Sequence, residues 1–171
     1  MKAFFFVLNF WRNFDMKIEM NECIKRLIEH EGLCLKPYRC SMGKLTIGIG
    51  RNLEDNPLNF EEKKALGDYM HGITENGAKM LLRNDINRCV EELKNTIKGF
   101  DELEGDRQYA LLDMCFQLGI NGLKKFRIMR RAIENKDFNR AYEACLKSKY
   151  AKQVPLRAKR IAGAIRYGVW R

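Results

Sequence analysis

Three side chains in the first third of the sequence have the types and spacing that acid-assisted hydrolysis needs. Glu31 is followed by Cys40 nine positions later, and Thr46 stands six positions beyond that. A protonated carboxyl can neutralise a departing oxygen, as the cleavage of a glycosidic bond requires. A thiol on the opposite face can act as base or nucleophile, although only a few per cent is ionised at neutrality at its ordinary pKa. A threonine hydroxyl can orient the attacking water.

Each of these residues also has a plain structural interpretation. A glutamate at a helix end is usually solvated, a single cysteine in a turn is usually incidental, and threonine is common in strands. Because all three residues occur together at this spacing, a catalytic role is favoured over a chance arrangement. The apolar neighbours Leu27, Ile28 and Leu33 favour the neutral form of Glu31, whereas a nearby arginine would favour the charged form, so the balance stays open.

The elements around these residues change from helix to strand. Apolar residues at helical spacing predict a helix from Asn21, as N-cap, to Glu31, with Gly32 as its stop. Strand-forming residues between 33 and 50, interrupted by a turn at 41–44, predict an antiparallel hairpin or a three-stranded sheet. Glu31 is therefore expected where the helix meets the sheet.

The rest of the chain has a helical pattern. Asn59 with Glu62 forms a near capping box, and Thr74 precedes a long helix that continues to Ile97. A buried helix is expected from Tyr109 to Leu118, ending at Gly119. Shorter helices are expected near 123–134, 137–148 and 155–167, the last with Pro155 at its first position and Gly168 at its stop.

These elements predict an α+β fold with two lobes. A small β-containing lobe covers about 33–73, and a larger all-α lobe covers about 98–171 together with the first helix. The long middle helix joins them, and a cleft is expected between the lobes at the sheet. We expect one such domain over 16–171. Residues 1–15 are interpreted as an N-terminal extension, because their apolar run at 3–8 is too short to span a bilayer and lacks a small-residue cleavage site.

Positive charge is concentrated in the C-terminal part. From residue 120 onward there are 15 Lys and Arg against 3 Asp and Glu, whereas the chain as a whole has a net charge of +10. Such a stretch suits a polyanion such as nucleic acid, anionic lipid or a phosphate-bearing bacterial envelope, or it is a solubilising surface. We find no nucleic-acid-binding signature beside the charge, so no nucleic acid is expected as a partner.

The six cysteines do not form a metal-binding or disulfide pattern along the sequence. There is no CxxC pair, and the only histidines are His30 and His71, so no metal and no cofactor is expected. Four of the cysteines fall on apolar helical positions and are expected to be free core thiols: Cys23, Cys89, Cys115 and Cys145. Cys34 has no assigned role.

The same residues carry a resemblance to a known family. Glu31, Cys40 and Thr46 fit the pattern Glu-x8-Asp/Cys-x5-Thr of the lysozyme (muramidase) family of T-even and related double-stranded DNA phages. The segments 116–119 (Phe-Gln-Leu-Gly) and 157–160 (Arg-Ala-Lys-Arg) match further family motifs at consistent spacing. The resemblance covers roughly residues 17–171.

The resemblance implies roles for particular residues. Glu31 would be the general acid, and Cys40 and Thr46 would act on water, by an inverting or a covalent route. Phe116, Gln117 and Arg157 would line the substrate cleft. The T-even enzyme has a histidine after its Gly-Ile-Gly, where this chain has Arg51 and Asn52. No histidine–carboxylate pair is carried over, and Asn52 is expected only to border the cleft.

The implied activity is a peptidoglycan hydrolase that cuts the β-1,4 bond between N-acetylmuramic acid and N-acetylglucosamine for host lysis by a phage or prophage. The protein would be a monomer, made in the host cytoplasm without stable membrane insertion, and a holin would admit it to the periplasm. The alternative is a catalytically impaired wall-binding or virion module. Lytic transglycosylase chemistry, which gives an anhydro product, is an enzymatic rival.

Overall fold

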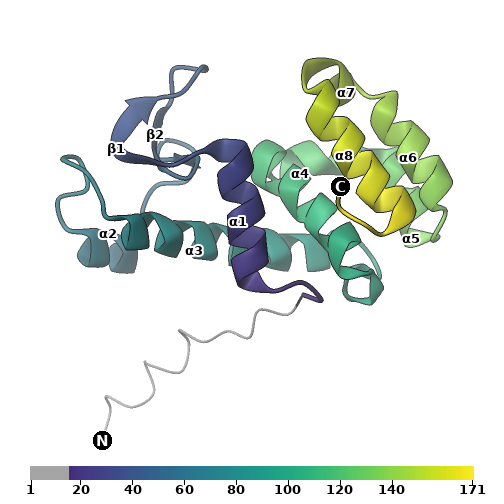
Figure 1. Cartoon of the computed structure of the whole chain (residues 1–171), viewed down its shortest axis with the longest axis horizontal. Coiled ribbons are helices and arrows are strands. Elements are labelled where there is room, and N and C mark those ends of the chain that lie inside the picture. Colours follow the sequence, from purple (N-terminus) through teal and green to yellow (C-terminus); the bar gives the residue numbers. More distant parts are fainter. Residues whose placement is uncertain (1–15) are drawn as a thin grey trace, which may run out of the picture.

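The structure is a computed structural model that describes residues 16–171, so the expected extension at 1–15 lies outside it. A small sheet stands apart from a group of helices, and one long helix runs beneath both (Figure 1). The helices that follow the sheet and precede the C-terminal group are α2 (Phe60–Leu66) and α3 (Glu75–Lys94). The α+β fold predicted from the sequence is confirmed.

The sheet has three antiparallel strands in sequence order: β1 (Cys34–Arg39), β2 (Leu45–Gly48) and β3 (Arg51–Asn52). Thr46 lies in the central strand, opposite Tyr38 on one side and Asn52 on the other. The turn between β1 and β2 is closed by backbone hydrogen bonds from Cys40 N to Lys44 O (3.0 Å) and from Gly43 N to Cys40 O (2.8 Å). The predicted turn at 41–44 is thereby confirmed.

Helix α1 (Met20–Glu31) ends at Gly32 as predicted, with φ +73° at that glycine. Its predicted N-cap was wrong: the cap is Glu19, whose carbonyl accepts from the backbone N–H groups of Glu22 and Cys23. Asn21 lies inside the first turn, and its side-chain oxygen accepts from Arg83 Nη2 at 2.9 Å. The side-chain oxygen that was expected to cap this helix thus has its partner 62 residues away.

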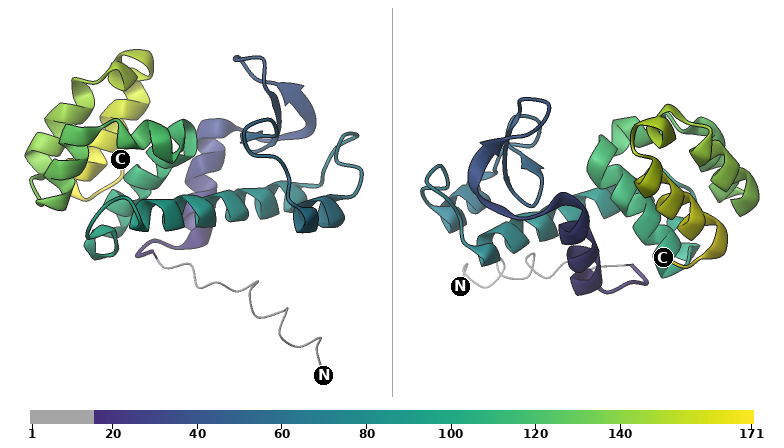
Figure 2. Two further views of the ribbon diagram at one scale, coloured as in Figure 1. Left: turned by 180° about the vertical axis from the view of Figure 1, so that it is seen from behind. Right: turned by 45° about the horizontal axis from the view of Figure 1, so that its top comes forward.

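The predicted start signals of α2 and α3 are confirmed. Asn59 and Glu62 form a reciprocal capping box, and Thr74 Oγ1 accepts from Gly77 N at 3.0 Å. Helix α3 ends at Lys94, short of the predicted Ile97, which is buried in the following turn. Helix α3 packs against β2 and against α4, and α1 crosses it (Figure 2).

The C-terminal helices differ from the prediction mainly in their ends. After the short 3-10 turn η1 (Phe100–Glu102), helix α4 (Gly105–Lys124) starts earlier than expected and continues past Gly119, where the backbone departs from helical geometry at φ +66° and ψ +162°. The remaining helices are α5 (Arg127–Glu134), α6 (Phe138–Leu146), α7 (Lys149–Gln153) and α8 (Pro155–Tyr167). The expected helix at 137–148 ends two residues early, because Ser148 caps α7 by accepting from Ala151 N. Pro155 and Gly168 begin and stop α8 as predicted.

The core is continuous from the sheet to the C-terminal helices and includes the four predicted core thiols, which are free and buried. A buried ion network fastens the sheet to the helices: Arg51 in β3 bonds Glu62 of α2 at 2.7 Å and Asp85 of α3 at 2.5 Å. All three side chains are at most 4% exposed, so the charges are paired out of water. Among residues 16–171, no helix has the length and apolar character that crossing a membrane demands.

Candidate active site

Glu31 lies at the junction between α1 and β1, and an arginine from the far end of the chain holds its carboxylate. Arg157 Nη1 in α8 donates to Glu31 Oε1 at 2.8 Å. The same guanidinium donates to Asp113 of α4 through Nε (2.9 Å) and Nη2 (2.8 Å). The side chain of Glu31 is 22% exposed, whereas that of Asp113 is fully buried. One guanidinium therefore orients a buried and a solvent-accessible carboxylate.

Burial alone would lower the pKa of Arg157, but the hydrogen bonds and charge of Asp113, followed by those of Glu31, raise it above its ordinary value. His30 Nδ1 also lies 3.1 Å from Asp113 Oδ1, and Arg160 approaches the other ring nitrogen at 3.4 Å. Asp113 is thus the centre of a polar cluster inside the helical lobe.

Cys40 and Thr46 come together at the turn between β1 and β2. Backbone hydrogen bonds at Met42 and Lys44 lower the pKa of the Cys40 thiol below its ordinary value, and a hydrogen bond with the Thr46 side chain adds to the effect. Thr46 is buried, and its hydroxyl donates to Lys44 O at 3.1 Å. Cys40 and Thr46 of the sequence pattern thus lie near each other, and their catalytic roles stay predictions.

Two observations relate the sheet lobe to Glu31. Burial, followed by the charges of Cys34, Cys40 and Glu31, raises the pKa of Tyr38, so that ring lies within the field of all three groups. At Gly50, between β2 and β3, an added Cβ would lie 3.4 Å from Glu31 Oε2 and 3.5 Å from Phe116 Cε1. The backbone of the sheet lobe thus closely approaches the acid and the predicted cleft residue Phe116.

Gln117 is exposed at the end of the first part of α4, just before the irregular Gly119. Its side-chain oxygen accepts from the hydroxyl of Tyr150 in α7 at 2.6 Å, and this bond fixes the orientation of the amide. Burial raises the pKa of Tyr150, so the phenol acts as a donor at neutral pH. The predicted pair Phe116 and Gln117 therefore stands on the helical side of the junction that holds Glu31.

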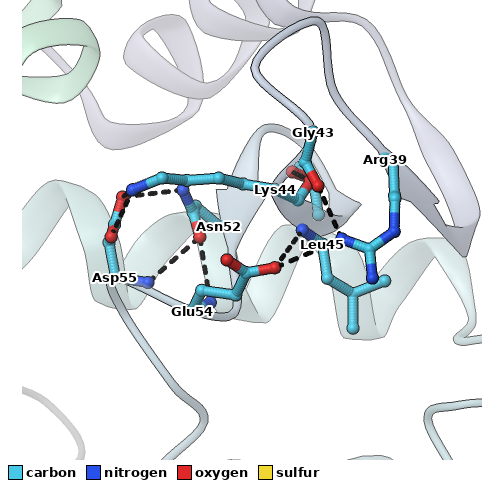
Figure 3. Close-up of polar contacts among 8 residues, drawn as sticks. Arg39, Gly43, Lys44, Leu45, Asn52, Glu54 and Asp55 are labelled. Carbon is cyan, nitrogen blue, oxygen red and sulfur yellow. Dashed lines mark hydrogen bonds and ion pairs between the residues drawn. The ribbon is translucent and has the colours of Figure 1, made fainter.

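Asn52 has a local structural role. Its side-chain oxygen accepts from the backbone amides of Glu54 (2.9 Å) and Asp55 (3.0 Å), and its amide donates to Asp55 Oδ2 at 2.8 Å (Figure 3). Lys44 pairs with the same Asp55 carboxylate. Asn52 thus organises the turn after β3, and the border role expected from the sequence stays a prediction.

Asp113 and Tyr150 were missed by the analysis of the sequence. Asp113 lies in the segment 109–118, whose apolar character predicted a core helix and nothing more. A single carboxylate in such a helix was the available signal, since aspartate is almost never fully buried without a partner. No comparable signal marked Tyr150, because its link to Gln117 depends on how α7 packs against α4.

Comparisons with known proteins identify the family of this chain. A family profile described as phage lysozyme matches residues 28–166. Over 164 residues, the chain is 31% identical to the pre-baseplate central spike protein Gp5 of Enterobacteria phage T4, covering 88% of this chain but only 28% of that protein. It is 29% identical over 164 residues to probable T4-type lysozyme 1 of Dictyostelium discoideum, covering 87% of this chain and 96% of that protein.

Probable T4-type lysozyme 2 of the same organism is 27% identical over 166 residues, again with 96% of its length covered. The profile match extends from the helix that ends at Glu31 to the helix that carries Arg157, so it includes every residue of the site described above. The chain belongs to the phage lysozyme family and is a glycoside hydrolase with muramidase-like function.

Proposed function

We propose that this enzyme hydrolyses the β-1,4 bond between N-acetylmuramic acid and N-acetylglucosamine in bacterial peptidoglycan, with Glu31 as the general acid. The observation that carries the proposal is a partly exposed carboxyl held at 2.8 Å by Arg157, where the sheet and the helical lobe meet. Asp113 remains as counter-ion to Arg157 when Glu31 is protonated. The acid form of Glu31 therefore leaves no unpaired guanidinium behind it.

Cys40 and Thr46 act on the water in this proposal. The thiolate takes a proton from the attacking water while the Thr46 hydroxyl orients it, and the proton of Glu31 goes to the departing sugar oxygen. The lowered pKa of Cys40 supports this role, because more thiolate is present at neutrality than for an ordinary cysteine. No metal or cofactor takes part in the step.

A basic groove supports a substrate with acidic groups. It occupies about 1060 Å³ between the end of α4 and helices α5, α6 and α7, and Tyr150, which bonds Gln117, is part of its wall. Five cationic side chains line it, against the single carboxylate of Glu143: Lys125, Arg127, Arg140, Lys147 and Lys149. Part of the C-terminal excess of positive charge thus faces a concave surface beside the proposed site.

The test is loss of turbidity of Gram-negative cells with permeabilised outer membranes, followed by mass spectrometry of the released fragments. Hydrolysis gives muropeptides with reducing N-acetylmuramic acid ends, whereas transglycosylation gives anhydro ends. Reducing ends support the proposal, and anhydro ends would replace it with the rival chemistry.

Host lysis by a phage or prophage is the biological role we propose. Synthesis in the cytoplasm and release through a holin follow from that role. Expression in a bacterial host should leave the cells intact until a holin or a membrane-damaging agent is added. Lysis by the enzyme expressed without either would contradict this part of the proposal.

A second candidate is a wall-cutting or wall-binding module of a virion, favoured by the 31% identity to a phage spike protein. The two roles differ in where the protein is found. Its presence in purified particles of an inducing prophage would support the virion role, whereas its restriction to the lysate supernatant would support the lytic one.

A further inference from the structure

Two cysteines that are 26 positions apart in the sequence meet inside the protein, between α3 and α4. Cys89 lies in α3 and Cys115 in α4, and both are at most 3% exposed. Glu92, three residues after Cys89 on the same helix, lies beside them and is partly exposed. The two sulfur atoms and a carboxylate oxygen of Glu92 all lie within 4.8 Å of one another.

We propose that Cys89, Cys115 and Glu92 form a binding site for one thiophilic divalent cation of the Zn²⁺ and Cd²⁺ class. Three atoms that are no more than 4.8 Å apart share a point that is at most about 2.8 Å from each, and zinc needs about 2.3 Å to sulfur and about 2.1 Å to oxygen. Small side-chain movements would therefore bring all three atoms to the distances of metal ligands. A water molecule on the exposed side of Glu92 would complete four ligands.

The contacts already present are weak ones that a metal ion can replace. Cys115 Sγ lies 3.8 Å from Glu92 Oε2, and Cys89 shares a hydrogen bond with Cys115. Binding would release the two thiol protons to solvent and form two metal–thiolate bonds and one metal–carboxylate bond. Two thiolates with one carboxylate select borderline and soft cations over Mg²⁺ and Ca²⁺.

The charges around the cluster are compatible with such a site. Two thiolates, one carboxylate and a divalent ion leave one net negative charge. Arg88, next to Cys89, places positive charge near that thiol. Asp85 opposes it, but this carboxylate is already paired with Arg51 at 2.5 Å and with Arg88 at 3.1 Å.

The site is at odds with the expectation of no metal that followed from spacing along the chain. That expectation considered pairs close in sequence, whereas these ligands come together only because α3 packs against α4. Cys115 directly precedes Phe116 and Gln117, so a bound ion would fix α4 to α3 beside residues of the proposed substrate site. A gain in thermal stability is therefore expected on binding.

The experiment titrates the reduced full chain with Cd²⁺ alone and follows thiolate-to-cadmium charge-transfer absorption, bound metal per chain, and Tm. We expect one ion per chain and a raised Tm in the wild type, and loss of both effects in Cys89→Ala and Cys115→Ala. The matched control Cys145→Ala removes an equally buried thiol from another part of the core and should keep both effects.

Glu92→Gln keeps both thiols, so it tests the site even if the cysteine variants fail to fold. It should weaken cadmium binding by at least about tenfold, with an unchanged circular dichroism spectrum. The proposal is overturned if the wild type binds no cadmium. It is equally overturned if Cys34→Ser/Cys40→Ser abolishes the absorption while Cys89→Ala retains it, because the signal would then come from the sheet lobe.

Discussion

Arg157 serves two carboxylates at once, and this sharing determines what each of them can do. The fully buried Asp113 receives two of its hydrogen bonds and is the second carboxylate partner of the guanidinium. Glu31 receives one hydrogen bond and retains access to solvent. At the scale of residues, the positioning charge and the proposed catalytic proton are therefore separated onto different carboxylates.

Asp113→Asn should show this separation. Removing the buried charge leaves Arg157 with Glu31 as its remaining carboxylate partner among those described, which favours the ionised form of the acid. We expect a loss of kcat larger than any change in KM, and a loss of stability of about 3 kcal/mol in urea denaturation. The control Glu143→Gln, which removes an exposed ion pair with Lys147, should cost less than about 1 kcal/mol.

The thiol of Cys40 should determine how the rate depends on pH. Because the pKa of Cys40 is lowered, the fraction present as thiolate, and with it the rate, should rise with pH through a value below that of an ordinary cysteine. Cys40→Asp should move this rising limb to far lower pH, since carboxylates ionise near pH 4, and Cys40→Ser should remove it. Profiles of kcat against pH for the wild type and the two variants measure these shifts. If the rise in kcat with pH is unchanged in Cys40→Ser, the role of the thiol is refuted.

At the scale of elements, the loop between β2 and β3 brings the sheet against Glu31. Gly50 has φ +72°, and a Cβ there would be in van der Waals contact with both Glu31 and Phe116. Gly43 has nearly the same backbone conformation, at φ +77°, but its Cβ would meet nothing within 4 Å. Substituting each glycine in turn therefore separates the effect of backbone strain from the effect of a new side chain that touches the site.

Both Gly50→Ala and Gly43→Ala should lose about 1–2 kcal/mol of stability, because each places a side chain at positive φ. Activity should fall in Gly50→Ala alone. Thermal denaturation and turbidity assays on the two variants check this, and equal activity would show that the loop does not shape the site.

Arg51 links β3 to α2 and α3, and its removal should lower the free energy of unfolding strongly. Arg51→Met leaves Glu62 and Asp85 buried without their guanidinium, at an expected cost of about 3–5 kcal/mol. Arg39→Met removes a pair with Glu54 in which the side chains are 69% and 49% exposed, so its cost should stay below about 1 kcal/mol. Denaturant midpoints give both values, and equal losses would contradict the account of the network.

Local signals in the sequence were sufficient for several helix ends. Gly32, Thr74, Pro155 and Gly168 act within one turn of chain, so they could be recognised before the structure was known. Asn21 was a misleading signal, and in the structure its side chain bonds Arg83, which is distant in sequence. A prediction from local pattern fails where a tertiary contact takes the capping group.

At the scale of the whole molecule, the two lobes meet at Glu31, and this part of the site could be predicted from the motif. The buried carboxylate that supports it could not, because pairing Asp113 with Arg157 and His30 requires α4, α8 and α1 to be packed together. The same holds for the thiols of α3 and α4. Sequence spacing thus indicated the proposed reacting groups, whereas the residues that position them emerged from the packing of helices.

The most direct test of the central claim compares the wild type with Glu31→Gln on purified peptidoglycan, by mass spectrometry of the soluble fragments and by binding to the insoluble wall. We expect muropeptides with reducing ends from the wild type, and a rate about 10² to 10⁴ lower for Glu31→Gln with wall binding retained. Equal rates for the two proteins would contradict the assignment of Glu31 as the general acid.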